Sequence, residues 1–193
     1  MKKILLLAAA FIAISAFTSL SHIWRSDPPN SQLGFTVTYL GILDISGIFN
    51  DFKITVKTEK PDFSDAYFEL SARVASIDTR LEERDDLLKT ADFFDAEQYP
   101  TLTFESKSIK STGKNKYKLT GDLTLHGITK SVTMDLLYRG TTENPGSKKQ
   151  TAGFLITGSI NRSDFGIATK YPSPILSEQI QINIDSEFIQ NGK

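Results

Sequence analysis

Apolar and polar side chains alternate along most of this chain, and that period of two restricts the possible folds strongly. Between residues 33 and 39, every second side chain is leucine, phenylalanine, valine or tyrosine. The same alternation recurs in further segments, namely residues 52–56, 68–74, 102–104, 117–125, 132–138, 154–160 and 180–188. Because successive side chains of a strand point to opposite faces, the pattern predicts about eight strands, each with one buried and one solvated face.

The segments between these predicted strands are short and rich in turn residues, as in Lys60-Pro61-Asp62 and Glu143-Asn144-Pro145-Gly146. Parallel strands would need crossover helices and would read as continuous apolar runs, so the pattern predicts an antiparallel, all-β fold. About eight such strands can close into a barrel whose interior is filled by side chains or holds one small ligand. A two-sheet sandwich is the alternative architecture.

One segment, residues 79–98, breaks the alternation. Thr79-Arg80-Leu81-Glu82 has the pattern of a capping box, which predicts a short helix over residues 83–89. Residues 90–98 are expected to add one or two helical turns, ended by the proline at position 100. Three leucines of this insertion are expected to face the sheet: Leu81, Leu87 and Leu88.

Phenylalanine is abundant, with 13 copies against a single tryptophan. Many of these side chains fall on or near the apolar faces of the predicted strands: Phe35, Phe49, Phe52, Phe68, Phe104, Phe154 and Phe188. Two interpretations fit this pattern, a dense aromatic core or an apolar cavity of the kind that binds small molecules. The alternation alone does not distinguish between them.

The composition excludes several kinds of chemistry. The absence of cysteine removes disulfides, thiol catalysis and iron–sulfur sites. The two histidines, His22 and His126, are too few for a transition-metal site built from protein ligands. With 22 basic and 23 acidic residues, the chain has no overall electrostatic attraction for nucleic acid.

Sequence motifs typical of enzymes are also missing. The chain has no G-x-S-x-G, P-loop, dinucleotide-binding glycine motif or H-E-x-x-H. His126 precedes a glycine at the end of a predicted strand, where we expect a turn residue hydrogen-bonded to the backbone. The carboxylates of Glu82, Glu83, Asp85 and Asp86 share one short helix and are expected to be solvated. We therefore expect a binding protein with no catalytic residues, no metal and no cofactor.

The first 21 residues have the pattern of a secretory signal peptide. Two lysines precede an apolar run of about fourteen residues, which is shorter than the roughly 20 that a membrane span needs. Ser19 and Ser21 supply small residues for cleavage after Ser21, and cleavage after Ala16 is the alternative. We therefore expect residues 1–21 to be removed. Residues 22–193 would then form one soluble domain in the periplasm or outside the cell.

Several short motifs occur along the chain in a fixed order and spacing. They are Ser76-Ile77-Asp78-Thr79, Arg84–Lys89, Ala91–Asp95, Tyr99-Pro100, Thr103-Phe104, Gly121–Lys130 and Arg162–Ile167. Together, from about Trp24 to Phe188, they resemble the YceI-like family of secreted, polyisoprenoid-binding proteins. The resemblance covers essentially the whole chain after the predicted signal peptide.

The resemblance implies a lipocalin-like, eight-stranded antiparallel β-barrel, with the helical insertion between its third and fourth strands. Its apolar cavity would hold a polyisoprenoid or a similar amphiphile as the only bound group, which favours a hollow interior. The family also implies homodimers, and a membrane protein is a candidate donor or acceptor of the lipid. The residues expected to line the cavity are Phe35, Val37, Tyr39, Phe49, Phe52, Phe68, Leu70, Phe104, Leu123, Met134, Phe154, Ile156 and Ile182.

Arg84 and Arg162 lie within the matching motifs and are candidates for contacting a polar head group. The alternative is that each forms an ion pair with a nearby aspartate and fixes a loop, the aspartates being Asp85, Asp92 and Asp164. Where family members often have histidine, this chain has Asn30, Tyr39 and Leu87, so its head group would differ or be held differently. The competing function is that of a filled barrel that acts in stress response or binds a protein partner, without lipid.

Overall fold

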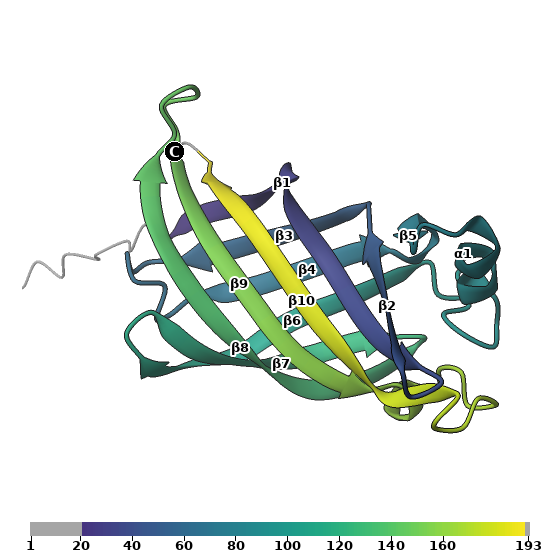
Figure 1. Ribbon diagram of the computed structural model, residues 1–193. Helices are drawn as coiled ribbons and strands as arrows, with labels where there is room; N and C mark the ends of the chain where they lie inside the picture. Colours follow the sequence, from purple (N-terminus) through teal and green to yellow (C-terminus); the bar gives the residue numbers. More distant parts are fainter. Residues whose placement is uncertain (1–20, 192–193) are drawn as a thin grey trace, which may run out of the picture.

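The computed structural model describes residues 21–191, which form a closed antiparallel β-barrel (Figure 1). Apart from Ser21, the predicted signal peptide lies outside these residues. The strands are β1 (His22–Tyr39), β2 (Leu43–Phe49), β3 (Phe52–Thr58), β4 (Tyr67–Arg73), β5 (Ile77–Asp78), β6 (Thr101–Gly113), β7 (Lys116–Leu125), β8 (Ile128–Glu143), β9 (Gln150–Asn161) and β10 (Leu176–Gln190).

Eight of these strands form the ring, and pairing between β10 and β1 closes it. The order around the ring is β1, β3, β4, β6, β7, β8, β9 and β10, and every neighbouring pair is antiparallel. The predicted eight-stranded barrel is therefore confirmed, and the sandwich alternative is wrong. Closure removes the exposed edges that an open sheet of this size would leave.

The long strand β1 changes its partner halfway along. Its first residues pair with β3 and its second half pairs with β2, while β10 pairs along most of its length. An irregularity between Ser26 and Ser31 separates the two halves and contains Pro28 and Pro29, which have no N–H to donate to a ladder. As a result, β2 extends the barrel wall toward one end, where it pairs with the short β5.

The helical insertion lies where it was predicted, between the strands that contain Phe68 and Phe104. It contains α1 (Glu82–Lys89), an eight-residue helix at one end of the barrel (Figure 1). The sequence pattern did not predict three parts of the fold, namely β2, β5 and the first half of β1. Among residues 21–191, no helix is long and apolar enough to span a membrane.

The details of the insertion differ from the prediction. The N-cap of α1 is Leu81 rather than Thr79, and a leucine side chain has no polar atom with which to cap a helix. Between the two residues, Arg80 adopts a left-handed φ of 66°. The capping box and the further helix over residues 90–98 are both wrong, since the latter segment consists of turns. Leu81 and Leu87 are exposed rather than packed on the sheet, and only Leu88 of the three leucines is partly buried.

The barrel end opposite α1 is filled by aromatic side chains. The fully buried Phe154 lies at their centre, with its ring centroid 4.9 Å from that of Phe63 and 5.3 Å from those of Tyr138 and Phe188. Trp24 packs against Phe63, with the ring centroids 5.3 Å apart and the ring planes tilted by 57°. We call this group, together with Phe68, the aromatic plug. A filled core is therefore the correct description of this end of the barrel.

The connection between β3 and β4 delivers Phe63 into the aromatic plug, and the carboxylate of Asp65 holds that connection. Asp65 accepts hydrogen bonds from the hydroxyl of Thr58 (2.6 Å) and the backbone N–H groups of Glu59 (3.1 Å) and Lys60 (3.3 Å). Desolvation alone raises the pKa of Asp65, but these bonds outweigh it, so its pKa lies below the ordinary value. The carboxylate form is thus the one that the folded loop favours.

We expect Asp65→Asn to lower the free energy of unfolding by no more than about 1 kcal/mol at pH 6 and to remove part of its acid dependence. Because the folded pKa is lowered, the contribution of Asp65 is present above pH 4 or so and is lost as the pH falls through the folded value. Denaturant unfolding at pH 6 and pH 3 measures both effects. A difference between the two proteins that is the same at both pH values would contradict the assignment.

Candidate functional site

The middle of the barrel encloses an apolar cavity, which we call the inner cavity. The centre of a water molecule can reach only about 90 Å³ inside it, so it is narrow. Every residue around it is apolar: Leu33, Gly34, Phe35, Phe49, Ile54, Phe68, Leu70, Phe94, Leu102, Phe104, Leu119, Leu123, Leu125, Met134, Ile156, Ile160, Ile180, Ile182 and Ile184. A space of this kind favours thin apolar groups over water, since a water molecule would find no hydrogen-bond partner there.

A second, wider cavity lies at the α1 end of the barrel, and we call it the outer cavity. The centre of a water molecule can reach about 480 Å³ of it. It lies between β2, α1 and the segment that precedes β10, and its wall combines apolar and polar side chains. The lining residues are Phe35, Val37, Tyr39, Ile45, Thr79, Glu83, Arg84, Leu87, Leu88, Phe93, Phe94, Arg162, Ile167, Tyr171, Ile175, Leu176 and Ile180.

The two cavities adjoin, because Phe35, Phe94 and Ile180 line both of them. Phe49 packs between the two phenylalanines, with its ring centroid 5.8 Å from Phe35 and 6.0 Å from Phe94. These rings form a neck between the inner and outer cavities. The interior of the barrel thus has three consecutive zones: the aromatic plug, the narrow apolar inner cavity and the wider outer cavity at the end that carries α1.

Gly47 in β2 makes room for the neck. A Cβ atom at this position would lie 2.5 Å from the ring of Phe35 and 2.8 Å from the Cγ2 methyl of Thr79. Both distances are well below van der Waals contact. The ring of Phe35 can therefore lie against β2 only because position 47 has no side chain.

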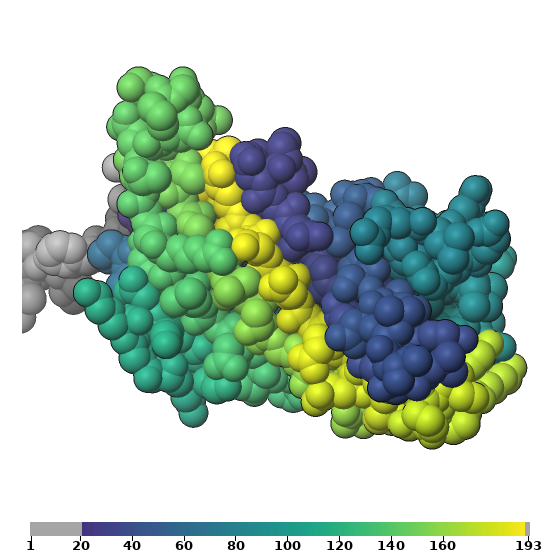
Figure 2. All heavy atoms as spheres, in the orientation of Figure 1, coloured from purple at the N-terminus to yellow at the C-terminus, as the bar shows by residue number. Residues whose placement is uncertain are grey.

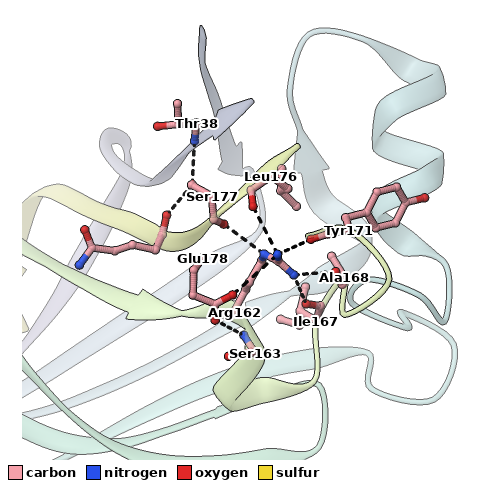
Figure 3. Close-up of polar contacts among 10 residues, drawn as sticks. Thr38, Arg162, Ser163, Ile167, Ala168, Tyr171, Leu176, Ser177 and Glu178 are labelled. Atoms are coloured by element: carbon pink, nitrogen blue, oxygen red, sulfur yellow. Dashed lines mark hydrogen bonds and ion pairs between the residues drawn. The ribbon is translucent and has the colours of Figure 1, made fainter. Parts of the chain in front are cut away.

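Arg162 is buried at the wall of the outer cavity, where it holds the chain between β9 and β10 (Figure 3). It lies in the short 3-10 helix η2 (Arg162–Phe165), and its side chain is only 4% exposed. All its N–H groups point at backbone carbonyls, namely those of Ser177 (3.1 Å), Ile167 (3.2 Å), Ala168 (2.6 Å), Leu176 (3.3 Å) and Tyr171. A guanidinium has five N–H groups, so none is left for a ligand.

The charge of Arg162 is balanced from one side by Glu178, whose Oε2 lies 3.7 Å from Nη2 of Arg162. The backbone N–H of Ser163 donates to the other carboxylate oxygen at 3.0 Å. Hydrogen bonds from Ser163, together with the weaker attraction of Arg162, hold the pKa of Glu178 below its ordinary value. Arg162 is thus a fixed part of the wall, with Glu178 as its ionic partner rather than the aspartates proposed from the sequence.

Arg84 has a different environment. Its Nε donates to the hydroxyl of Thr79 and its Nη2 to the carbonyl of Thr79, each at 2.7 Å. That hydroxyl in turn donates to Asp85 at 2.6 Å, so the aspartate positions Thr79 rather than pairing with Arg84 directly. Within residues 21–191, Nη1 of Arg84 has no hydrogen-bond partner. Arg84 therefore presents a positioned cation with free N–H groups at the outer cavity.

His126 occupies the tight turn between β7 and β8, with a φ of 51°. Its Nδ1 lies 3.0 Å from the carbonyl oxygen of Phe165, and its ring packs edge-on against Tyr99. The prediction of a turn residue bonded to the backbone is therefore confirmed. No group of three or more metal-ligating side chains occurs in the part of the chain that the structure describes.

The structure places most of the predicted cavity residues around the two cavities. Nine of the thirteen line the inner cavity: Phe35, Phe49, Phe68, Leu70, Phe104, Leu123, Met134, Ile156 and Ile182. Val37 and Tyr39 line the outer cavity instead. Phe52 and Phe154 line neither cavity: Phe154 lies at the centre of the aromatic plug, and Phe52 is partly buried and packs against the core. Asn30 lies in the irregular part of β1, away from both cavities.

Some lining residues were not predicted. Ile180 and Ile184 have the same alternation as Ile182 and could have been chosen by that signal. Phe94 and Tyr171 come from irregular segments, where no periodicity shows which side chains turn inward. Four residues that the resemblance had singled out do line the outer cavity, namely Tyr39, Arg84, Leu87 and Arg162. The part of its wall that comes from irregular segments had no signature in the sequence, because it depends on how the loops fold back.

A closed antiparallel barrel that is plugged at one end and encloses an apolar cavity in its middle has the lipocalin-like architecture. The model of the YceI-like domain matches residues 24–188, and the chain belongs to this family. The UPF0312 protein SA2479 of Staphylococcus aureus is 32% identical over 166 residues, which is 84% of this chain and 94% of that protein.

Solved structures give the same result. BcnA of Burkholderia cenocepacia is 27% identical with a TM-score of 0.74, over 84% of this chain and 98% of that one. The YceI protein of Campylobacter jejuni is 31% identical with a TM-score of 0.73, over 78% of this chain and 88% of that one. A polyisoprenoid binding domain from Saccharophagus degradans, 11% identical with a TM-score of 0.65, covers 87% of this chain and 98% of its own length and shares the fold.

Proposed function

We propose that this protein binds a polyisoprenoid or a similar long-chain amphiphile and carries it through the periplasm or the extracellular medium. The observation that supports this most directly is the wholly apolar, narrow inner cavity that adjoins a wider cavity containing Arg84. The apolar chain would lie in the inner cavity with its far end against the aromatic plug. The polar end would stay in the outer cavity.

The energetics of burial fit such a ligand. Each methylene removed from water contributes about 0.8 kcal/mol, so a chain of several isoprene units binds strongly without many polar contacts. A narrow tube selects a thin chain rather than a broad ring system. The cavity also removes from water a molecule that is too insoluble to cross an aqueous compartment alone.

Three further considerations support the proposal. The carboxylates of α1 and the ring of His126 do not converge on a common point in the cavities, since only Glu83 of these residues lines either one. A protein of the same fold is described as a polyisoprenoid binding domain, which indicates that this architecture suits such ligands. A near-neutral chain with a signal-like leader is compatible with a carrier that acts outside the cytoplasm.

Mass spectrometry of the purified protein tests the proposal. The protein is expressed with its leader in a host that makes isoprenoid lipids, and native and denaturing masses are compared. We expect an additional mass under native conditions that organic extraction removes and whose fragmentation identifies a prenyl chain. A bare mass, also after incubation with prenyl lipids and fatty acids, would refute the carrier function and leave the protein-binding alternative.

We expect Arg84→Gln to weaken binding of a prenyl phosphate by about tenfold, the effect of one lost charge-assisted hydrogen bond. Binding of the prenyl alcohol of equal length should change little, because its chain contacts are the same. Arg80→Gln is the matched control, since it removes the same charge from an exposed side chain outside the two cavities. Equal losses for the phosphate and the alcohol, or equal effects of the two variants, would show that Arg84 does not contact the head group.

A further inference from the structure

Large exposed apolar side chains gather at the entrance to the outer cavity. Ile42 is 87% exposed at the tip of the β1–β2 hairpin, and Leu40 and Leu43 beside it are about half exposed, at 49% and 56%. We call the whole group the mouth rim, which consists of Tyr39, Leu40, Ile42, Leu43, Leu87 and Ile175. Single exposed apolar residues are ordinary on a protein surface, but a cluster at one opening indicates a contact surface.

The mouth rim is held together by backbone contacts. The N–H of Leu40 donates to the carbonyl of Ile175 at 3.0 Å, which ties the hairpin tip to the segment before β10. Gly41 lies against Pro174, where an added Cβ would be in ordinary contact at 3.5 Å. Figure 2 shows the blue hairpin and the yellow-green segment beside each other at the end of the molecule that carries α1. The exposed side chains are therefore displayed on an ordered scaffold.

Three residues of the mouth rim also line the outer cavity, so the exposed apolar surface is continuous with the cavity wall there. Tyr39, Leu87 and Ile175 are both exposed at the surface and part of the outer cavity wall. An amphiphile leaving the cavity would pass from lining side chains to rim side chains. The mouth rim therefore lies on the path by which a ligand would enter or leave the outer cavity.

The charges around the mouth rim restrict what can cover it. Residues 39–43 and 171–176 contain no charged side chain. The neighbouring α1 is acidic, with Glu82, Glu83, Asp85 and Asp86 against Arg84 and Lys89. An uncharged apolar tip beside an acidic helix matches a neutral, zwitterionic lipid surface, whereas an anionic surface would repel the helix.

We propose that the mouth rim inserts into the interfacial layer of a neutral lipid bilayer, so that an amphiphile moves between membrane and outer cavity without crossing water. This inference rests on the proposed function. A bilayer requires only a few apolar side chains at its interface, whereas a stable protein partner would need about 800 Å² on each side, with polar groups at its edge. The two uncharged loop tips of the mouth rim meet the first requirement.

The test uses flotation of the purified protein with phosphatidylcholine vesicles that contain no isoprenoid. We expect the wild type to float with the vesicles and the bound fraction of the double variant Leu40→Ser, Ile42→Ser to fall about tenfold, because two large apolar side chains lose their contact with lipid. Ile23→Ser is the matched control, since Ile23 is also exposed but lies in the first part of β1, away from α1. Neither high salt nor added phosphatidylglycerol should strengthen binding.

Failure of the wild type to float, or equal flotation of the double variant, overturns the proposal. Self-association of the wild type that the double variant abolishes, with no vesicle binding, would assign the mouth rim to a second copy of the chain instead. Binding of geranylgeraniol in vesicle-free solution is measured in parallel. If the wild type binds geranylgeraniol but does not float, only the docking surface is refuted. If the double variant binds geranylgeraniol but no longer floats, the docking surface is supported. Absent geranylgeraniol binding by the wild type counts against the proposed function. Circular dichroism verifies that the variants are folded.

Discussion

Ile182→Trp is expected to reduce the affinity for long isoprenoid chains by about a hundredfold while the barrel remains folded. Ile182 lines the inner cavity and is only partly buried, so its side chain borders empty space. Its neighbour across the β9–β10 pair is Gly158, and the side chain over that glycine is the flexible Met134, whose Cγ lies 3.0 Å from where a Cβ of residue 158 would stand. Met134 can change rotamer to admit a larger ring. An indole at this position would displace about four methylene groups of the ligand, which contribute about 3 kcal/mol to binding.

A series of prenyl alcohols of increasing length measures this effect. The loss should be small for a ten-carbon chain and large for chains of twenty carbons or more, because only the longer chains reach past the neck. Gln181→Trp is the control, since Gln181 precedes Ile182 on β10 and is exposed on the outer face. If Ile182→Trp leaves the affinity for long chains unchanged and thermal unfolding shows a native barrel, the chain does not occupy the inner cavity.

The barrel itself could be predicted from the sequence, because strand alternation is a local signal that survives in the folded state. The buried positions of β4, for example, are Phe68, Leu70 and Ala72, as the period of two requires. The prediction was incomplete where alternation is interrupted. In the first half of β1 it is broken by Pro28 and Pro29, and there the strand is held by pairing with its neighbours and by the single buried side chain of Trp24.

The division of the interior into plug and cavity could not be predicted. Phe104 and Phe154 have the same residue type and the same alternation, yet Phe104 borders the inner cavity and Phe154 lies in the aromatic plug. The difference arises from Phe63, which the β3–β4 connection folds into the barrel with a φ of 59°. Phe63 lies in a loop, where no periodicity indicates which side chains turn inward. Its sequence neighbourhood therefore does not show that it packs against Phe154 and leaves the space beside Phe104 open.

The insertion shows how a local signal can be overridden. Thr79 has the sequence of a helix cap, but its hydroxyl instead lies between Arg84 and Asp85, where it accepts from one and donates to the other. Thr79 is 2% exposed, and its hydroxyl, backbone N–H and carbonyl are all hydrogen-bonded to Arg84 or Asp85, as buried polar groups require. The competition between these two uses of one side chain depends on tertiary contacts that a sequence pattern does not contain.

Arg162→Met is expected to lower the free energy of unfolding by about 4 kcal/mol, the largest effect on stability that the polar groups of this site predict. The substitution removes the donors of five backbone carbonyls, and the bonds to two of them, Ile167 and Ala168, are buried while the other three are partly buried. Each buried carbonyl costs about 1–3 kcal/mol when unpaired, less what relaxation and water recover. Arg162→Lys should recover only part of the loss, because an ammonium has three N–H groups and no planar fork. Lys170→Gln is the control, since its ion pair with Asp92 is exposed and screened by solvent, so its loss should leave the stability almost unchanged.

The same variant separates a positioning role of Arg162 from direct contact with a head group. The loop that Arg162 holds supplies Ile167, Tyr171 and Ile175 to the outer cavity wall. If Arg162 acts through this loop, hydrogen exchange of residues 166–176 should rise in Arg162→Met, and the affinities for a prenyl phosphate and for its alcohol should fall together. If it contacts the ligand, the phosphate alone should be affected and the loop should remain protected. Because every N–H of the guanidinium already has a carbonyl partner, we expect the first result, with Arg84 as the only one of the two arginines that distinguishes phosphate from alcohol.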